Sequence, residues 1–176
     1  AALLAYVRRG GGFVGVHSAT DTFYEWPEYL DLIGGYFDGH PWRQTVTVQI
    51  ENQAHPSTAH LGASFEINDE IYQFRDWSRA NVDVLMSLDV TSVDMMARGS
   101  NRDDNDFALA WTRTEGDGRV CYTALGHRPE VWDEERFQRH LLEGIAWTMR
   151  PTFRRSRERR RMPAAARVWP AASVLK

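Results

Sequence analysis

Two short apolar runs, each followed by a histidine, are the clearest pattern along this chain. The segment 13–16 is apolar and follows three glycines, and the segment 119–125 is similarly rich in apolar and β-branched residues. Runs of this length bounded by turn residues are typical of strands that are buried in a parallel sheet. His17 ends the first run and His127 follows the second. We therefore expect the two strands to be parallel and close together, with helices on both faces and both histidines at one edge of the sheet, where α/β proteins bind ligands.

The remaining elements alternate between helical and strand patterns up to residue 150. Apolar spacing predicts helices over 1–9, 25–36 and 133–149, and strict alternation predicts a half-exposed strand over 45–51. The polar segment 91–106 is expected to be a flexible loop. On the last helix we expect His140 at the surface and an inward apolar face of Phe137, Leu141, Leu142, Ile145 and Trp147. Further strands are predicted at 70–74, 82–88 and 107–113.

Polar side chains gather where the buried runs end. His17 is followed closely by Ser18 and Asp21, and His40 lies in a segment rich in turn-forming residues. Neutral imidazole is a common metal ligand, so His17, His40 and His127 are candidate ligands of a divalent metal such as zinc, with Asp21 orienting His17 or contacting substrate. Two other interpretations stay open: these histidines contact a polar ligand directly, with His127 as a general base, or the polar residues only form caps and turns.

The single cysteine, Cys121, excludes an intrachain disulfide and lies in the middle of a predicted strand. A thiol at such a position is most often a small core side chain.

Charge divides the chain into two parts. Residues 1–150 carry 13 basic and 23 acidic side chains, a net charge of −10, whereas residues 151–176 carry eight basic and one acidic. The acidic body argues against a nucleic-acid partner, and no stretch approaches the ~20 apolar residues of a membrane span. The arginine-rich segment 151–176 is expected to be a disordered extension.

Four ordered motifs resemble the ThuA-like family, named for trehalose utilisation. They are GGGFVGVHSATD, the following FYEWPEYLDLIGGYFDGHPW, HPSTAHL with DEIYQF, and GRVCYTALGHRPEVW. The resemblance implies an α/β fold with a mostly parallel three-layer sheet, of the class I glutamine-amidotransferase (flavodoxin-like) type. It also implies that residues 1–150 form one ThuA-like domain that lacks its N-terminal portion. In this comparison His17 occupies the place of the amidotransferase nucleophile, so glutaminase chemistry through a cysteine is not expected.

The same resemblance implies a role in carbohydrate catabolism, on a disaccharide such as trehalose, a glycoside or a keto-glycoside. His17, His127 and Asp21 are then the candidate catalytic residues of a metal-assisted hydrolase or lyase. Ser18, Tyr24, His40 and Trp42 are candidate sugar contacts, since aromatic rings stack on the C–H faces of sugars. The alternatives are a non-catalytic sugar-binding module and an inactive fragment. With one reduced cysteine, the cytoplasm is the expected location.

Overall fold

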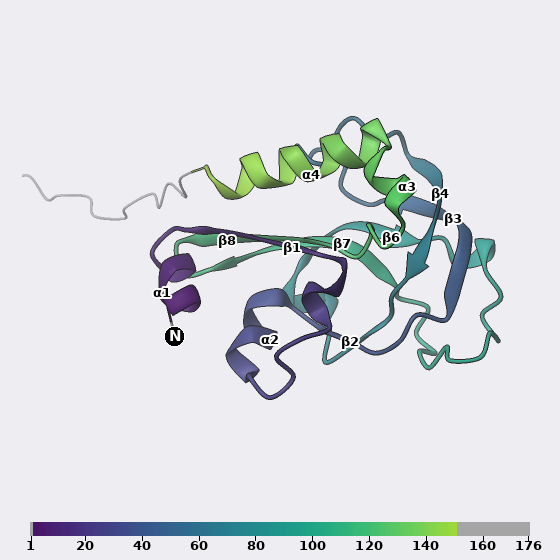
Figure 1. Ribbon diagram of the computed structural model, residues 1–176, viewed down its shortest axis with the longest axis horizontal. Helices are drawn as coiled ribbons and strands as arrows, with labels where there is room; N and C mark the ends of the chain where they lie inside the picture. The colour runs from purple at the N-terminus through teal and green to yellow at the C-terminus, as the bar shows by residue number, and fades with distance from the viewer. Residues whose placement is uncertain (1, 151–176) are drawn as a thin grey trace, which may run out of the picture.

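A six-stranded sheet organises the protein. The computed structural model describes residues 2–150, and the sheet has the order β1-β8-β7-β6-β3-β4 (Figure 1). Only β1 and β8 are parallel, and every other neighbouring pair is antiparallel. The expectation of a mostly parallel sheet is therefore wrong, although the fold is α/β. The strands are β1 (Gly12–Val16), β3 (Trp42–Ile50), β4 (Ser64–Ile71), β6 (Asp83–Leu88), β7 (Ala108–Glu115) and β8 (Gly118–Thr123).

A short connection explains the antiparallel pairing of β7 with β8. The turn between β7 and β8 is only two residues long, and Gly116 adopts a φ of +63° there. A turn this short joins antiparallel strands, because a parallel pair needs a long crossover connection. The predicted strand at 70–74 is divided in the structure: β4 ends at Ile71, and Phe74 begins the short strand β5 (Phe74–Arg75), which pairs with β2 (Tyr36–Phe37).

Helices cover both faces of the parallel pair, as expected. Figure 1 shows α4 (Glu135–Thr148) and the short α3 (Pro129–Trp132) on one side of the sheet, and α1 (Ala2–Arg8) and α2 (Pro27–Ile33) on the other. Helix α2 begins with Pro27, which is preorganised for the first helical position, and ends at Gly34 with a φ of +96°. Short 3₁₀ helices lie at His17–Thr20, Arg79–Asn81 and Val90–Ser92.

Helix α4 packs through small and polar residues rather than through its aliphatic ones. We expected Leu142 and Ile145 to face inward, but they are 65% and 38% exposed. The buried residues are instead Phe137, His140, Gly144 and Thr148. A Cβ atom at Gly144 would lie 3.1 Å from the Sγ of Cys121, so the helix approaches β8 closely on that side. This close approach decides which face of α4 is buried.

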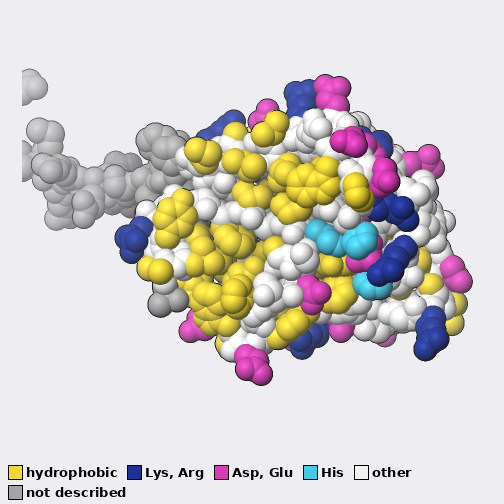
Figure 2. All heavy atoms as spheres, in the orientation of Figure 1, with side chains coloured by type: hydrophobic (Ala, Val, Ile, Leu, Met, Phe, Trp, Pro, Cys, Tyr) yellow, Lys and Arg dark blue, Asp and Glu magenta, His cyan; other side chains and the backbone are white. Residues whose placement is uncertain are grey.

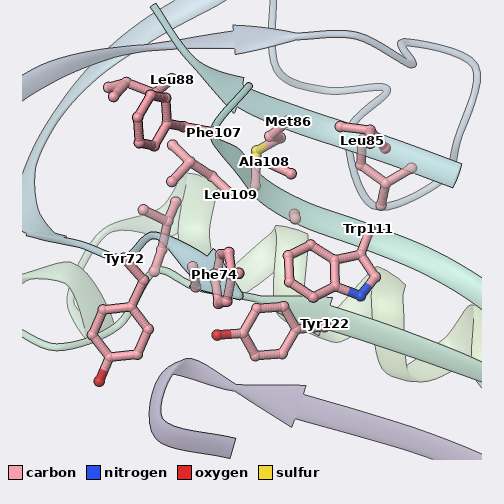
Figure 3. Close-up of a cluster of buried hydrophobic side chains, with 14 of the residues drawn as sticks. Tyr72, Phe74, Leu85, Met86, Leu88, Phe107, Ala108, Leu109, Trp111 and Tyr122 are labelled. Carbon is pink, nitrogen blue, oxygen red and sulfur yellow. The ribbon is translucent and has the colours of Figure 1, made fainter. Parts of the chain in front are cut away.

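On the face of the sheet that α4 does not cover, the core is aromatic and extends to His17 at the end of β1. The rings of Phe74, Trp111 and Tyr122 pack together, with the Trp111 and Tyr122 centroids 4.4 Å apart (Figure 3). The fully buried Tyr122 hydroxyl donates a hydrogen bond to the backbone oxygen of His17 at 2.8 Å. The core therefore fixes the backbone at the end of β1.

The segment 91–106 is held to the body by polar contacts. Gln73 donates to the carbonyl oxygen of Gly99 at 2.6 Å, and Arg102 donates to that of Phe74 at 3.0 Å. Among residues 2–150, no helix is long and apolar enough to cross a membrane. The predicted extension at 151–176 lies outside the described residues.

Candidate active site

His17 lies in a strained turn at the end of β1. Its φ of +44° is in the left-handed region, which a residue with a β-carbon adopts only where its surroundings hold it there. The parallel pairing of β1 with β8 brings the carbonyl oxygen of Ala124 to 2.7 Å from its Nδ1. Because a carbonyl only accepts, Nδ1 carries the proton, and the lone pair of Nε2 is left free for a ligand.

His127 reaches the same position from the loop after β8. Its Nδ1 lies 3.2 Å from the Nε2 of His17, so the prediction that the two histidines share one edge of the sheet is confirmed. The loop is anchored by the buried carboxylate of Asp69, which accepts three backbone N–H bonds, from Gly126 at 2.7 Å and from His127 and Arg128 at 3.1 Å. Asp69 is thus a positioning residue for the His127 side chain.

Glu70 completes the group, and sequence reasoning missed it. Its Oε1 lies 3.6 Å from the Nε2 of His17 and 3.5 Å from the Nδ1 of His127. Its Oε2 pairs at 2.5 Å with the Nε of Arg43, the residue directly opposite on β3. Glu70 is 3% exposed. A buried carboxylate is costly unless paired, so the adjacent acids Asp69 and Glu70, placed directly before the apolar Ile71 and Tyr72, were a usable signal.

His40 lies beside this group rather than within it. Its Nδ1 is 3.9 Å from the Oε2 of Glu70, its Nε2 is 3.2 Å from Arg43, and its ring stacks on Phe37. The potential ligand atoms that lie within 4.8 Å of one another belong to His17, Glu70 and His127. Glu70, and not the expected His40, therefore groups with His17 and His127.

Asp21 interacts with Tyr24 and not with His17. Its carboxylate accepts a hydrogen bond from the Tyr24 hydroxyl, while Ala124 orients His17. Burial, followed by the Asp21 hydrogen bond, raises the pKa of Tyr24 to about 12. Tyr24 is 41% exposed and Ser18 is also exposed, so both remain available to a ligand, but neither has a contact with the histidine pair among the described residues.

The aromatic residue beside His17 is Tyr72 and not Trp42. Trp42 is 2% exposed, and its indole N–H donates to the backbone oxygen of Asp94 at 2.9 Å, so the expectation that it contacts sugar is wrong. As the first residue of β3 it faces the core, where it packs against Phe107. Tyr72, which was not predicted, lies against the site with its ring centroid 4.1 Å from that of His17. Burial, followed by the negative charge of Glu70, raises the pKa of Tyr72.

A cleft opens beside the grouped residues. It has a volume of about 310 Å³ and is lined by Arg43, Glu70, His127, Arg128, Pro129 and Glu130. Figure 2 shows histidine side chains gathered at the surface with basic side chains next to them. The site therefore has an exposed face that a small molecule can reach.

Cys121 and His140 lie away from this cleft, in the packing between β8 and α4. Burial raises the pKa of the Cys121 thiol to about 12, as fits the expected core position. His140 was expected at the surface, but it is buried, and its Nδ1 lies 2.9 Å from the backbone oxygen of Ser57. Burial lowers the pKa of His140 to about 4.

Solved structures share this fold. A ThuA-like protein from Bacteroides uniformis is 30% identical, with a TM-score of 0.71 over 84% of this chain and 62% of its own. A ThuA-like protein from Parabacteroides merdae is 22% identical, with a TM-score of 0.65 over 84% of this chain and 63% of its own. The chain thus spans less than two thirds of the length of these relatives. A β-galactosidase from Rahnella, 15% identical with a TM-score of 0.51, shares the fold over 84% of this chain and 20% of its own.

A family model confirms the resemblance that the four motifs suggested. No curated protein sequence matches the chain. The model described as "ThuA: Trehalose utilisation", however, matches residues 1–148, which include every residue of the site. The chain therefore belongs to the ThuA family.

Proposed function

We propose that this protein is a metal-assisted hydrolase or lyase of carbohydrate catabolism. Its substrate would be a disaccharide, a glycoside or a keto-glycoside, and a divalent metal such as zinc would be held by His17, Glu70 and His127. The single observation that carries the proposal is the convergence of three ligand atoms from three separate segments. The cytoplasm is the location that we propose for it.

The spacing of the ligand atoms supports a metal. The triangle formed by His17 Nε2, His127 Nδ1 and Glu70 Oε1 has edges of 3.2, 3.5 and 3.6 Å. Two ligands of a tetrahedral ion are separated by about 1.6 times the bond length, or about 3.3 Å for zinc bonds of about 2.0–2.1 Å. Three nitrogen or oxygen ligands with one open position are typical of catalytic zinc sites. When bound, such an ion polarises a substrate oxygen or activates water.

Neighbouring residues hold each of the three proposed ligands in a fixed orientation. The carbonyl of Ala124 accepts the Nδ1 proton of His17, and Arg43 pairs with the Oε2 of Glu70, which leaves Oε1 toward His17 and His127. Such outer contacts orient ligands and set the tautomer of an imidazole. Asp69 holds the backbone of His127. The three ligands are therefore preorganised, which favours binding of an ion without rearrangement.

The sugar substrate is supported by family membership and by exposed aromatic rings. The family is described by trehalose utilisation. Phe23 is 55% exposed and Tyr24 is 41% exposed, and both follow His17 closely in the chain. Exposed aromatic rings provide stacking surfaces for sugar C–H faces. Asp21 and Ser18 are the polar groups on the same segment that would bind hydroxyls.

The test is turnover that depends on both the metal and Glu70. The protein is treated with EDTA, reconstituted with Zn²⁺, Mn²⁺ or Co²⁺, and incubated with trehalose and with 3-keto-glucosides. Glucose released from trehalose and the aglycone released from the 3-keto-glucosides are measured. Activity should require a metal and be lost in Glu70→Gln. It should persist in Glu66→Gln, an exposed acid on the same strand. Activity that survives EDTA and Glu70→Gln would contradict the proposal. Sugar binding without turnover would favour a binding module.

A further inference from the structure

Arg128 enters the cleft without an acidic partner. It lines the cleft next to His127, and its backbone N–H is held by Asp69 at 3.1 Å. Among residues 2–150, no acidic side chain forms a salt bridge with its guanidinium. An arginine that lines a cleft, is fixed by its backbone and is free of an internal carboxylate is available to bind an anionic ligand.

Arg43 lines the same cleft from β3. Its Nε pairs with the Oε2 of Glu70 at 2.5 Å, and its Nη2 lies 3.2 Å from the Nε2 of His40. Its Nη1 has no partner among the described residues, and the side chain is 56% exposed. Arg43 can therefore keep its pairing with Glu70 and still donate to a ligand in the cleft.

The charge of the cleft contrasts with that of the rest of the body. Residues 1–150 carry a net charge of −10, so a randomly chosen surface depression would be acidic. Here Arg43 pairs with Glu70, and Arg128 forms no salt bridge with the exposed Glu130, the other acid that lines the cleft. A metal held by His17, Glu70 and His127 would add further positive charge. This arrangement favours a ligand that carries negative charge.

We infer that the substrate is an acidic sugar, whose carboxylate or phosphate group is bound by Arg128 and Arg43. The inference rests on the proposed function, since it names the substrate class of that site. A guanidinium presents parallel N–H donors that match two oxygens of a carboxylate or phosphate. The cleft volume of about 310 Å³ is at the lower end for small-molecule sites, which suits one ring of an acidic glycoside together with its charged group.

Calorimetric binding of matched sugars tests this inference. The probes are D-glucose, D-glucuronate, D-glucose 6-phosphate and inorganic phosphate, each titrated into zinc-loaded and into EDTA-treated protein. At least one acidic sugar should bind at least tenfold more tightly than glucose. Arg128→Gln should reduce that preference at least tenfold. The matched control is Arg9→Gln, which removes the same charge from a residue that precedes β1, at the opposite end of this strand from His17. It should leave the preference for the acidic sugar intact.

The outcomes separate this inference from the metal function. Equal binding of all three sugars, or a preference that survives Arg128→Gln, would overturn the inference. Inorganic phosphate that binds as tightly as the acidic sugars would also overturn it, because the site would then recognise an anion without a sugar. If the proposed metal site is wrong, the protein will instead bind no zinc. The Arg128-dependent preference would remain measurable in EDTA-treated protein, since Arg128 is not a metal ligand.

Discussion

The Nδ1 of His17 lies 2.7 Å from the carbonyl oxygen of Ala124, and this contact joins the two parallel strands at their carboxyl ends. It fixes the imidazole with its Nε2 lone pair directed toward His127 and Glu70. The positive φ of His17 and the Tyr122 hydroxyl bond to its backbone hold the turn in place. The strand pairing thus sets the chemistry of the site.

Alanine at His127 should remove ligand binding at little cost in stability. The side chain is 46% exposed, and surface truncations typically change the free energy of unfolding by less than about 0.5 kcal/mol. His17→Ala should cost more, because its ring is buried against Tyr72. Thermal melting and zinc titration of both variants check this. A large loss of stability in His127→Ala would identify this histidine as structural.

Asp69→Asn should loosen the loop that carries His127 and Arg128. The substitution removes the negative charge that strengthens three backbone hydrogen bonds. It also places an amide NH₂ group, which donates, beside backbone N–H groups that need an acceptor. We expect a loss of about 2–4 kcal/mol in the free energy of unfolding, together with weaker zinc binding. Urea denaturation measures the first effect. Asp103→Asn, on an exposed residue of the 91–106 segment, is the matched control and should change neither quantity.

Stability should fall between pH 6.5 and 4 because of His140. Burial lowers its pKa to about 4 in the folded protein, whereas the unfolded chain keeps a value near 6.5. The unfolded state therefore binds more protons in this window, and stability is fully present above it. The loss is up to about 3 kcal/mol. His140→Gln should flatten the dependence of the melting temperature on pH, and identical slopes for the variant and the parent protein would contradict this explanation.

The thiol of Cys121 should be inert in the native protein. It is buried against Gly144 of α4, and burial raises its pKa to about 12, so almost no thiolate exists at pH 8. A colorimetric disulfide reagent should react with it only after denaturation. Cys121→Ser should retain any sugar turnover. Rapid labelling of the folded protein, or loss of turnover in the serine variant, would return the thiol to consideration as a nucleophile.

The sequence predicted those residues of the site that closely follow a buried strand in the chain. The apolar runs that became β1 and β8 indicated where His17 and His127 lie, because each run ends in polar residues. Glu70 could not be placed in this way. Its role depends on β4 lying at the far edge of the sheet and on the register that sets Arg43 opposite it. Such non-local pairing leaves no periodic pattern in the sequence.

Two expectations about the fold were wrong, one about the sheet and one about the buried face of α4. The family resemblance implied a mostly parallel sheet, but the two-residue turn between β7 and β8 forces an antiparallel pair. On α4, aliphatic spacing placed Leu142 and Ile145 inside, whereas the close approach at Gly144 turned the other face to the sheet. On α4, tertiary packing therefore overrode the local pattern.

Zinc stoichiometry tests the central claim most directly. EDTA-treated protein is titrated with zinc in a calorimeter and the bound metal is confirmed by elemental analysis, for the parent chain and for Glu70→Gln and Glu66→Gln. Glu70 supplies a converging oxygen, whereas Glu66 is exposed on the same strand. We predict one zinc ion per chain, with an affinity at least about 100-fold weaker in Glu70→Gln and unchanged in Glu66→Gln. Absence of tight zinc binding by the parent chain, or equal affinity in Glu70→Gln, would contradict the metal site.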